Sequence, residues 1–330
     1  MPKIGSIELP EFPLLLAPME DVSDPPFRRL CKMHGADLMY SEFISSEGLI
    51  RDAIKSRQKL DIFDYERPVG IQIFGGDEEA MAMSASIVES VEPDLVDINF
   101  GCPVKKVVSK GAGAGVLKDI DLMVRLTKAV IKSTHLPVTV KTRLGWDDDS
   151  INIDEVAERL QDIGVQALSI HARTRAQMYK GHSDWEHIAR VKNNARISMP
   201  IFGNGDIDSP QKALEYKNKY GVDGIMIGRA AIGNPWIFNE IKHFFNTGET
   251  LAPPTIKDRI EAAKNHLIWS MEWKGERLGI VEMRRHYTNY FKGIHGFKPF
   301  RLQLVTLESG DALISFFKEI EEAYADYSFV

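Results

Sequence analysis

The sequence predicts a TIM (β/α)8 barrel followed by a small C-terminal helical domain. Eight short apolar runs recur along the first 230 or so residues, and amphipathic stretches of helical period separate most of them. Runs that are apolar on both faces suit a parallel sheet covered by helices, and eight βα units of this total length match a closed barrel. After Trp236 the alternation stops and only helical patterns follow.

The eight expected strands end in Gly, Pro or polar residues, and their starts are 24, 31, 26, 43, 29, 33 and 24 residues apart, close to one βα unit. They span residues 14–19, 38–43, 69–74, 95–100, 138–142, 167–171, 200–203 and 224–227. Helical periodicity is clear over 78–91, 120–133 and 153–163. An open doubly wound sheet is the rival fold, but no Gly-x-Gly-x-x-Gly motif follows the first strand.

We therefore expect a catalytic barrel domain over residues 1–245 and a helical domain over 246–330, with helices over 256–273, 279–291 and 309–327. The formal net charge is −6, so a nucleic-acid partner would require a local basic patch. Two cysteines form neither a disulfide framework nor a zinc pattern, and no apolar run is long enough for a signal sequence or a membrane span. We expect a soluble, cytoplasmic monomer without a metal.

Polar residues gather where six of the expected strands end, which in a barrel is the active-site face. They are Gln72, Asn99, Cys102, Lys141, Arg143, His171, Arg173, Asn204, Asp206, Gly228 and Arg229. A single strand-end Gln or His is as often structural as functional, but six strands ending this way indicate a site. The residues show neither a Ser-His-Asp order nor a metal-ligand pattern.

The ends of strands seven and eight form a candidate phosphate site. Gly203, Asn204, Gly205 and Asp206 close one strand, and Gly228 and Arg229 close the next. Glycines let main-chain N–H groups approach phosphate oxygens, and Arg229 offers a charge-assisted hydrogen bond. The structural alternative is that these glycines only make tight turns. Lys141 would enter the same mouth, either beside the negative charge of a reduced flavin or as a Schiff-base lysine.

The longest interval follows strand four and carries Cys102 between Gly101 and Pro103, followed by Lys105, Lys106 and Lys110. A buried inert thiol is the usual fate of a free cysteine. A strand-end thiol with an ordinary pKa is instead protonated at neutral pH and can donate a proton. Cys31 lies in a helical apolar pattern, which predicts core packing.

Taken in order, these motifs resemble the tRNA-dihydrouridine synthases, and among them the bacterial B-type branch, over essentially the whole chain. The resemblance rests on Leu16 to Met19, Asp24 to Arg28, Gln72 to Gly75, Asp97 to Pro103, Val140 to Arg143, Gly145 to Asp147, His171 to Thr174, Gly203 to Asp206 and Ile227 to Arg229. It implies FMN held by Pro18, Met19, Glu20, Gln72, Lys141, His171, Asn204, Gly205, Asp206, Gly228 and Arg229. The family commonly has small residues after Pro-Met, so Glu20 is expected to contribute only its main chain, and the role of Asp21 stays open.

The resemblance also implies the reaction. Reduced FMN would deliver a hydride to C6 of a uracil base in tRNA, Cys102 would give a proton to C5, and NADPH or NADH would re-reduce the flavin. Asn99, Arg143 and Arg173 are expected to contact the tRNA substrate at the mouth.

A local basic patch does exist in the helical region. Between residues 274 and 301, seven Lys and Arg residues stand against two Glu, a net charge of +5, with aromatic residues interleaved. Arg284, Arg285 and Lys292 are expected to contact the RNA backbone, as the family's helical domain binds tRNA. The alternative is a solvated helix face in which Tyr287 and Phe291, four residues apart, pack inward.

Two other functions fit parts of the pattern. A dihydroorotate dehydrogenase-like enzyme is also an FMN barrel with a cysteine or serine after strand four, but it leaves the basic helical domain unexplained. A non-catalytic RNA-binding protein on a barrel scaffold would explain that domain but not the polar strand ends.

Overall fold

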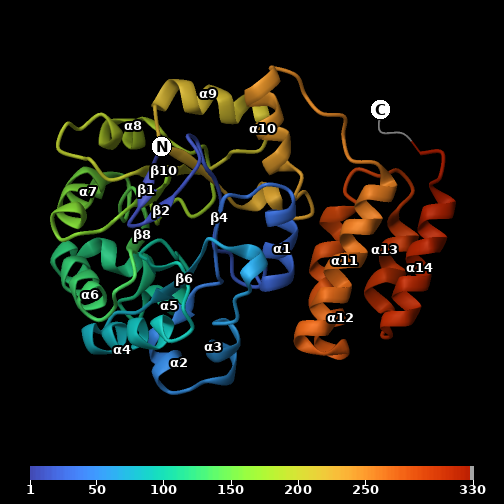
Figure 1. The fold of residues 1–330 in the computed structure, drawn as a ribbon, viewed down its shortest axis with the longest axis horizontal. Helices are drawn as coiled ribbons and strands as arrows, with labels where there is room; N and C mark the ends of the chain where they lie inside the picture. The colour runs from blue at the N-terminus through green and yellow to red at the C-terminus, as the bar shows by residue number, and fades with distance from the viewer. Residues whose placement is uncertain (328–330) are drawn as a thin grey trace.

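The computed structural model describes residues 1–327, and eight parallel strands in it close into a barrel, which confirms the predicted fold class (Figure 1). The sheet order is β4-β3-β11-β10-β9-β8-β7-β6-β5, and β4 also pairs with β6, which closes the ring. The eight positions are taken by β3 (Leu14–Leu16), β4 (Leu38–Tyr40), β6 (Val69–Phe74), β7 (Leu95–Asn99), β8 (Val138–Arg143), β9 (Leu168–His171), β10 (Ile201–Asn204) and β11 (Gly224–Ile227). The short β5 (Ile44–Ser45) continues the position of β4, because both pair in parallel with β6.

Helices surround this barrel, and several begin at side chains that cap them. Asp77, Asp119 and Ser209 each accept a hydrogen bond from a main-chain N–H of the first turn. The helices are α1 (Pro25–Met33), α2 (Ser46–Ile50), α3 (Ile54–Gln58), α4 (Glu78–Glu89), α5 (Lys105–Val108), α6 (Ile120–Lys132), α7 (Ile153–Asp162), α8 (Glu186–Lys192), α9 (Pro210–Tyr220) and α10 (Ile237–Thr247). Short 3-10 segments lie at Asp64–Glu66, Gly113–Lys118, Asp148–Ser150 and Arg229–Ala231.

An N-terminal hairpin, which the sequence analysis did not predict, covers the bottom of the barrel. Its strands β1 (Lys3–Ile4) and β2 (Ile7–Glu8) pair antiparallel around Gly5, whose φ of 58° suits glycine. Ile4 and the nearby Leu9 are buried against barrel residues such as Phe202. The amino-terminal end of the barrel is therefore filled, and the open end is the carboxyl one.

The strand register brings the predicted polar residues to one level of the barrel. Asn99 pairs with Lys141, and Arg143 pairs with His171, which pairs in turn with Asn204. Because side chains two residues apart point to the same side of a strand, residues from β7 to β10 enter the interior near the carboxyl edge. This level forms the floor and wall of the site.

The C-terminal helices form a second cluster beside α1 (Figure 1). They are α11 (Ile256–Lys274), α12 (Glu276–Tyr290), α13 (Lys298–Thr306) and α14 (Gly310–Ala323). The prediction missed α13, whose Pro299 lies in the first turn, where the missing N–H breaks no helical hydrogen bond. Tyr287 and Phe291 are fully buried in this cluster together with Leu30 of α1. The inward packing considered for these two aromatic residues is confirmed.

Among the residues described, no helix combines the length and the apolar character that crossing a membrane requires.

Candidate active site

A cavity of about 660 Å³ opens at the carboxyl end of the barrel. This volume lies within the roughly 300–1,000 Å³ that is usual for cofactor and ligand sites. Of the predicted residues, its lining includes Pro18, Met19, Glu20, Asn99, Cys102, Lys141, Arg143, His171, Asn204, Gly205, Asp206, Gly228 and Arg229. Gln72 and Arg173 are buried but are not part of the lining. Most of the candidate residues, drawn from six strands, thus share one space.

The thiol of Cys102 lies in the wall of this cavity and is held through its main chain. Asn99 Oδ1 accepts hydrogen bonds from the N–H groups of Gly101 and Cys102, at 2.9 and 2.8 Å. Burial raises the pKa of Cys102, and this effect outweighs the Val104 N–H and nearby cations that lower it. The thiol therefore carries its proton at neutral pH.

Arg143 supports the same loop from β8. Its Nε donates to the carbonyl oxygen of Gly101 at 2.7 Å, and Nη1 donates to the carbonyl oxygens of Thr174 and Met178 at 3.1 and 2.8 Å. Burial lowers the pKa of Arg143 to about 10. The side chain joins the cysteine loop to the loop after β9, so its first role in the structure is to hold these two loops together.

Lys141, Arg143 and His171 lie close together in the interior of the cavity, whose lining also includes the carboxylates of Glu20, Asp206 and Asp208. Burial, and then the nearby Arg143, lower the pKa of Lys141 to about 8. Burial together with Arg143, Lys141 and other cations lowers the pKa of His171 far below its usual value, so its ring is neutral. The positive charges of these side chains repel one another and so lower one another's pKa. An anionic ligand would reduce this repulsion and is therefore favoured.

The predicted phosphate end is built around Gly205, whose φ of 129° strongly favours glycine. A Cβ at this position would stand 3.0 Å from Cβ of Ser183 and 3.3 Å from Cδ2 of His171. Nδ2 of Asn204 donates to the carbonyl oxygen of Met226 at 2.7 Å, which fixes its amide across two strands. The main chain is thus open to the cavity where a side chain would not fit.

Asp206 is surrounded by donors of the chain itself. It accepts from Nη2 of Arg173 at 2.6 Å, from Nη2 of Arg229 at 3.2 Å and from the N–H of Ser183 at 2.9 Å. Burial alone would raise the pKa of Asp206, but the Arg173 and Ser183 hydrogen bonds bring it below its usual value. Asp206 therefore orients Arg229, whose guanidinium remains more than half exposed at the mouth.

Sequence reasoning missed Tyr179, which lines the cavity and is 52% exposed. Its ring centroid lies 5.5 Å from Cζ of Arg143 and 5.0 Å from Cζ of Arg229. These are cation–π distances. The only signal was an aromatic residue in a loop after a polar strand end, which is too common to stand out.

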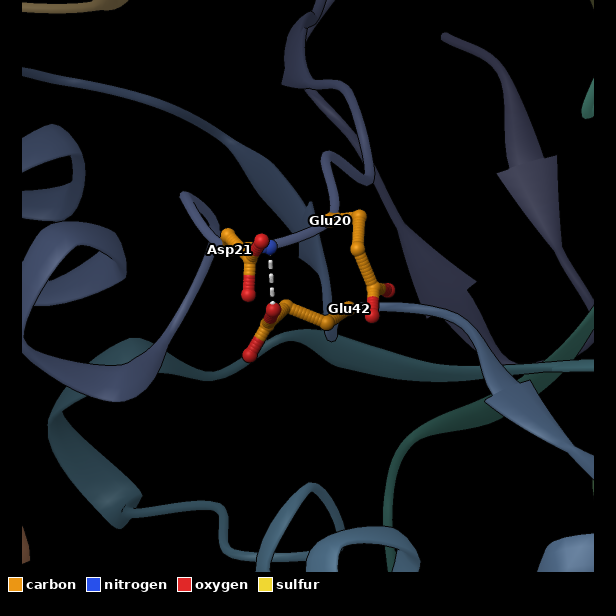
Figure 2. Close-up of side chains that lie close together, drawn as sticks. All are labelled: Glu20, Asp21 and Glu42. Atoms are coloured by element: carbon orange, nitrogen blue, oxygen red, sulfur yellow. Dashed lines mark hydrogen bonds between the residues drawn. The ribbon is translucent and has the colours of Figure 1, made fainter. Parts of the chain in front are cut away.

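A group of carboxylates stands at the rim, where the predicted Glu20 and the neighbouring Asp21 meet Glu42, which the sequence analysis did not single out (Figure 2). Oxygen atoms of Glu20, Asp21 and Glu42 lie within 4.8 Å of one another, and Glu42 accepts the N–H of Asp21 at 2.5 Å. Lys59 Nζ lies 2.6 Å from Glu20 and 3.9 Å from Glu42. Burial raises the pKa of Glu42 to about 7 despite Lys59. The group already contains a cation of the chain, and the expected absence of a metal stays a prediction.

The expected RNA-binding residues lie on or after α12. Arg285 and Lys292 are exposed and Arg284 is half-buried. Arg285 also forms an ion pair of 3.4 Å with Asp21 at the rim of the cavity. Among the interleaved aromatic residues, His286, Tyr287, Tyr290, Phe291 and Phe297 are buried. These five rings pack inside the protein, so they are not available to stack on RNA bases.

Fold and site together define a (β/α)8-barrel protein with a polar, thiol-bearing pocket at its carboxyl face. The dihydrouridine synthase family model matches residues 15–324. The chain is 40% identical over 310 residues to tRNA-dihydrouridine synthase B of Pseudomonas aeruginosa (94% of this chain, 92% of that protein) and 38% identical over 310 residues to that of Xanthomonas axonopodis pv. citri (94% and 93%). The chain therefore belongs to the dihydrouridine synthase family and groups with its bacterial B-type members, which confirms the resemblance.

Solved structures that are similar at low identity agree on the fold. Morphinone reductase in complex with tetrahydroNAD superposes with a TM-score of 0.52 at 13% identity, covering 77% of this chain and 92% of that one. A 2-naphthoyl-CoA reductase complex gives 0.57 at 13% identity, covering 73% and 51%. At these identities the likeness supports the barrel alone.

Proposed function

We propose that this protein reduces the C5=C6 bond of specific uridines in tRNA to 5,6-dihydrouridine, with FMN as cofactor. The observation that carries the proposal is the position of a protonated thiol, Cys102, in the wall of a cavity that is lined by Lys141 and Arg229. Family membership supports the reaction class and tRNA as the substrate.

The residues present fit FMN. Lys141 is a buried cation with a depressed pKa and would stabilise negative charge near N1 and O2 of a reduced isoalloxazine ring. Gly205 and Gly228 leave the main chain accessible, and the exposed guanidinium of Arg229 can pair with a phosphate. Bound FMN, re-reduced by NADPH or NADH, would supply the hydride for C6. Asn99 and Arg143 would act on the substrate side, whereas Arg173, which does not line the cavity, would act through Asp206 at the phosphate end and not by contact with tRNA.

Cys102 is the proton donor in this proposal. Saturation of the base requires a proton at C5, and a thiol with a raised pKa keeps that proton until the carbon becomes basic. Residues 1–245 would carry the reaction, and residues 246–330 would contact tRNA through Arg284, Arg285 and Lys292. The Arg285–Asp21 ion pair brings that surface to the rim of the cavity.

The deciding experiment maps dihydrouridine by mass spectrometry in tRNA from cells with and without this protein. We expect the loss of dihydrouridine at defined positions, and purified protein that carries the absorbance bands of a flavin. Unchanged tRNA, or a colourless protein that oxidises no nicotinamide, would contradict the proposal. Turnover of free dihydroorotate in place of tRNA would favour the rival enzyme.

A further inference from the structure

A carboxylate buried in the barrel interior lies beneath the cavity and has no part in the proposed reaction. Asp97 of β7 is 1% exposed, and its oxygens accept hydrogen bonds from Thr139 Oγ1 and Gln72 Nε2, both at 2.5 Å. Two residues further along the same strand, and therefore on the same face, lies Asn99.

Hydrogen bonds continue from Asp97 to the cysteine loop. Gln72 Oε1 accepts from Asn99 Nδ2 at 2.7 Å, and Asn99 Oδ1 accepts from the N–H groups of Gly101 and Cys102. The path Asp97, Gln72, Asn99, Cys102 is made of buried groups.

The chemistry of each group fixes the orientation of the next. An amide has nearly the same shape when it is turned over, so only its partners decide where its oxygen and nitrogen lie. An ionised carboxylate can only accept, so Gln72 must direct Nε2 toward Asp97 and Oε1 toward Asn99. Asn99 must then offer Nδ2 to Gln72, which leaves its own oxygen for the N–H of Cys102.

We infer that Asp97 is a positioning residue: through the amides of Gln72 and Asn99 it sets the main-chain position of Cys102, and so the placement of the thiol in the cavity. This inference rests on the proposed role of Cys102 and adds to it a residue that does not line the cavity. Burial raises the pKa of Asp97 to about 6, so at neutral pH the group is an acceptor only.

Isosteric substitutions can break and restore this path. In Gln72→Glu, the side chain at position 72 still accepts from Asn99 but can no longer donate to Asp97. The two facing carboxylates repel each other, which displaces the side chain at position 72 and, with it, the acceptor that holds Asn99. In the double variant Gln72→Glu/Asp97→Asn, the new amide donates to the new carboxylate and still accepts from Thr139, while Asn99 keeps its orientation. Thr139→Val is the matched control, because it removes a hydrogen bond from the same carboxylate without touching the path.

The test is the rate of iodoacetamide alkylation of Cys102, followed by mass spectrometry on purified protein with its flavin content measured. Cys31 is fully buried and provides an internal reference. The measurement is made above about pH 8, where two facing carboxyls no longer share a proton. There we expect Gln72→Glu to change the alkylation rate of Cys102 roughly tenfold, the effect of one lost hydrogen bond. The double variant and Thr139→Val should stay within about twofold of the original protein, which is smaller than the effect of one ordinary hydrogen bond.

Three outcomes would overturn the inference: an unchanged rate in Gln72→Glu, a double variant as altered as the single one, or an equal change in Thr139→Val. If Gln72→Glu does not fold, Asp97→Leu removes the anchor without adding charge and should give the same change. For dihydrouridine formation, measured in parallel, the Gln72→Glu variant should have a lower kcat and an unchanged KM. Alkylation of Cys102 does not depend on dihydrouridine formation. The alkylation rates would therefore still test the positioning role of Asp97 if the proposed function were wrong.

Discussion

Arg285 of α12 donates a hydrogen bond from Nη1 to the carbonyl oxygen of Asp21, 2.8 Å away, although 264 residues separate the two in the chain. Asp21 follows Glu20, which lines the cavity. A tRNA bound to the helical cluster at Arg285 would therefore lie next to the mouth of the barrel.

Charge reversal on α12 should weaken tRNA binding. For Arg284→Glu/Arg285→Glu we expect a loss of roughly tenfold or more in affinity at low salt and a shallower salt dependence, because cations that neutralise phosphates release counterions on binding. The measurement is a tRNA titration at several salt concentrations. NADPH oxidation without tRNA should stay the same.

The matched control for this variant is Lys128→Glu/Lys132→Glu on α6, which makes the same change in net charge at two exposed lysines of the barrel. Equal loss of tRNA affinity in both double variants would mean that overall charge, and not this surface, attracts the RNA.

Cys102→Ala should reduce dihydrouridine formation by about 10²- to 10⁴-fold, the usual contribution of a positioned general acid. Flavin content should not change, because Asn99 and Arg143 hold the loop through main-chain groups, which the substitution of the Cys102 side chain leaves in place. Cys31→Ala is the control: this thiol is buried in the barrel's hydrophobic core, so its loss should lower thermal stability and leave the reaction intact. Full activity of Cys102→Ala on native tRNA would reject the assignment.

Arg229→Ala should weaken FMN binding by about ten- to a hundredfold, as expected for one charge-assisted hydrogen bond. Riboflavin has the same ring without the phosphate, so its affinity should hardly change. Fluorescence titration of flavin-free protein with both compounds gives the comparison. A parallel loss for both compounds would place Arg229 at the ring and not at the phosphate.

The redox potential of bound FMN should depend on pH through Lys141. The pKa of this lysine is lowered to about 8 in the protein, so the ammonium is charged below that pH and neutral above it. The anionic ring of reduced flavin should therefore be stabilised less as the pH rises through about 8, which lowers the potential there, and Lys141→Met should remove this step. Redox titrations between pH 6 and pH 9 would reveal it, and an identical pH profile in the variant would contradict it.

A buried histidine pair should make the helical cluster sensitive to acid. Burial, and then Arg285, lower the pKa of His286 to about 3, and its ring centroid lies 4.6 Å from that of His266. Unfolded His286 binds a proton below about pH 6.5, whereas the folded residue does so only near 3, so this group destabilises the protein progressively as pH falls between these values.

Urea unfolding at several pH values can isolate this effect. His286→Gln should remove up to about 1.4 kcal/mol per pH unit from the acid slope of the unfolding free energy. The buried carboxyls with raised pKa, such as Glu42, act in the opposite direction but are present in both proteins and cancel. A variant with the original slope would show that His286 is not the group responsible.

Local pattern was sufficient for the barrel and for most of the site. Apolar runs of strand length define the eight strands, and in a parallel barrel their carboxyl ends must meet, so the sequence alone groups Cys102, Lys141 and Arg229 at one face. The short α13 and the N-terminal hairpin were not predicted, because a few residues carry too little periodicity.

The sequence by itself determined the fold class, the family and the face of the barrel that carries the site. Only tertiary structure decided which strand-end residues line the cavity. Arg173 follows its strand yet turns to Asp206, and Gln72 lies one level deeper against Asp97. Such directions depend on hydrogen-bond partners far along the chain, as does the approach of Arg285 to Asp21. Strand patterns depend on residues that are neighbours in sequence. The orientation of a polar side chain depends on which charged or polar group the closed barrel places within hydrogen-bond distance.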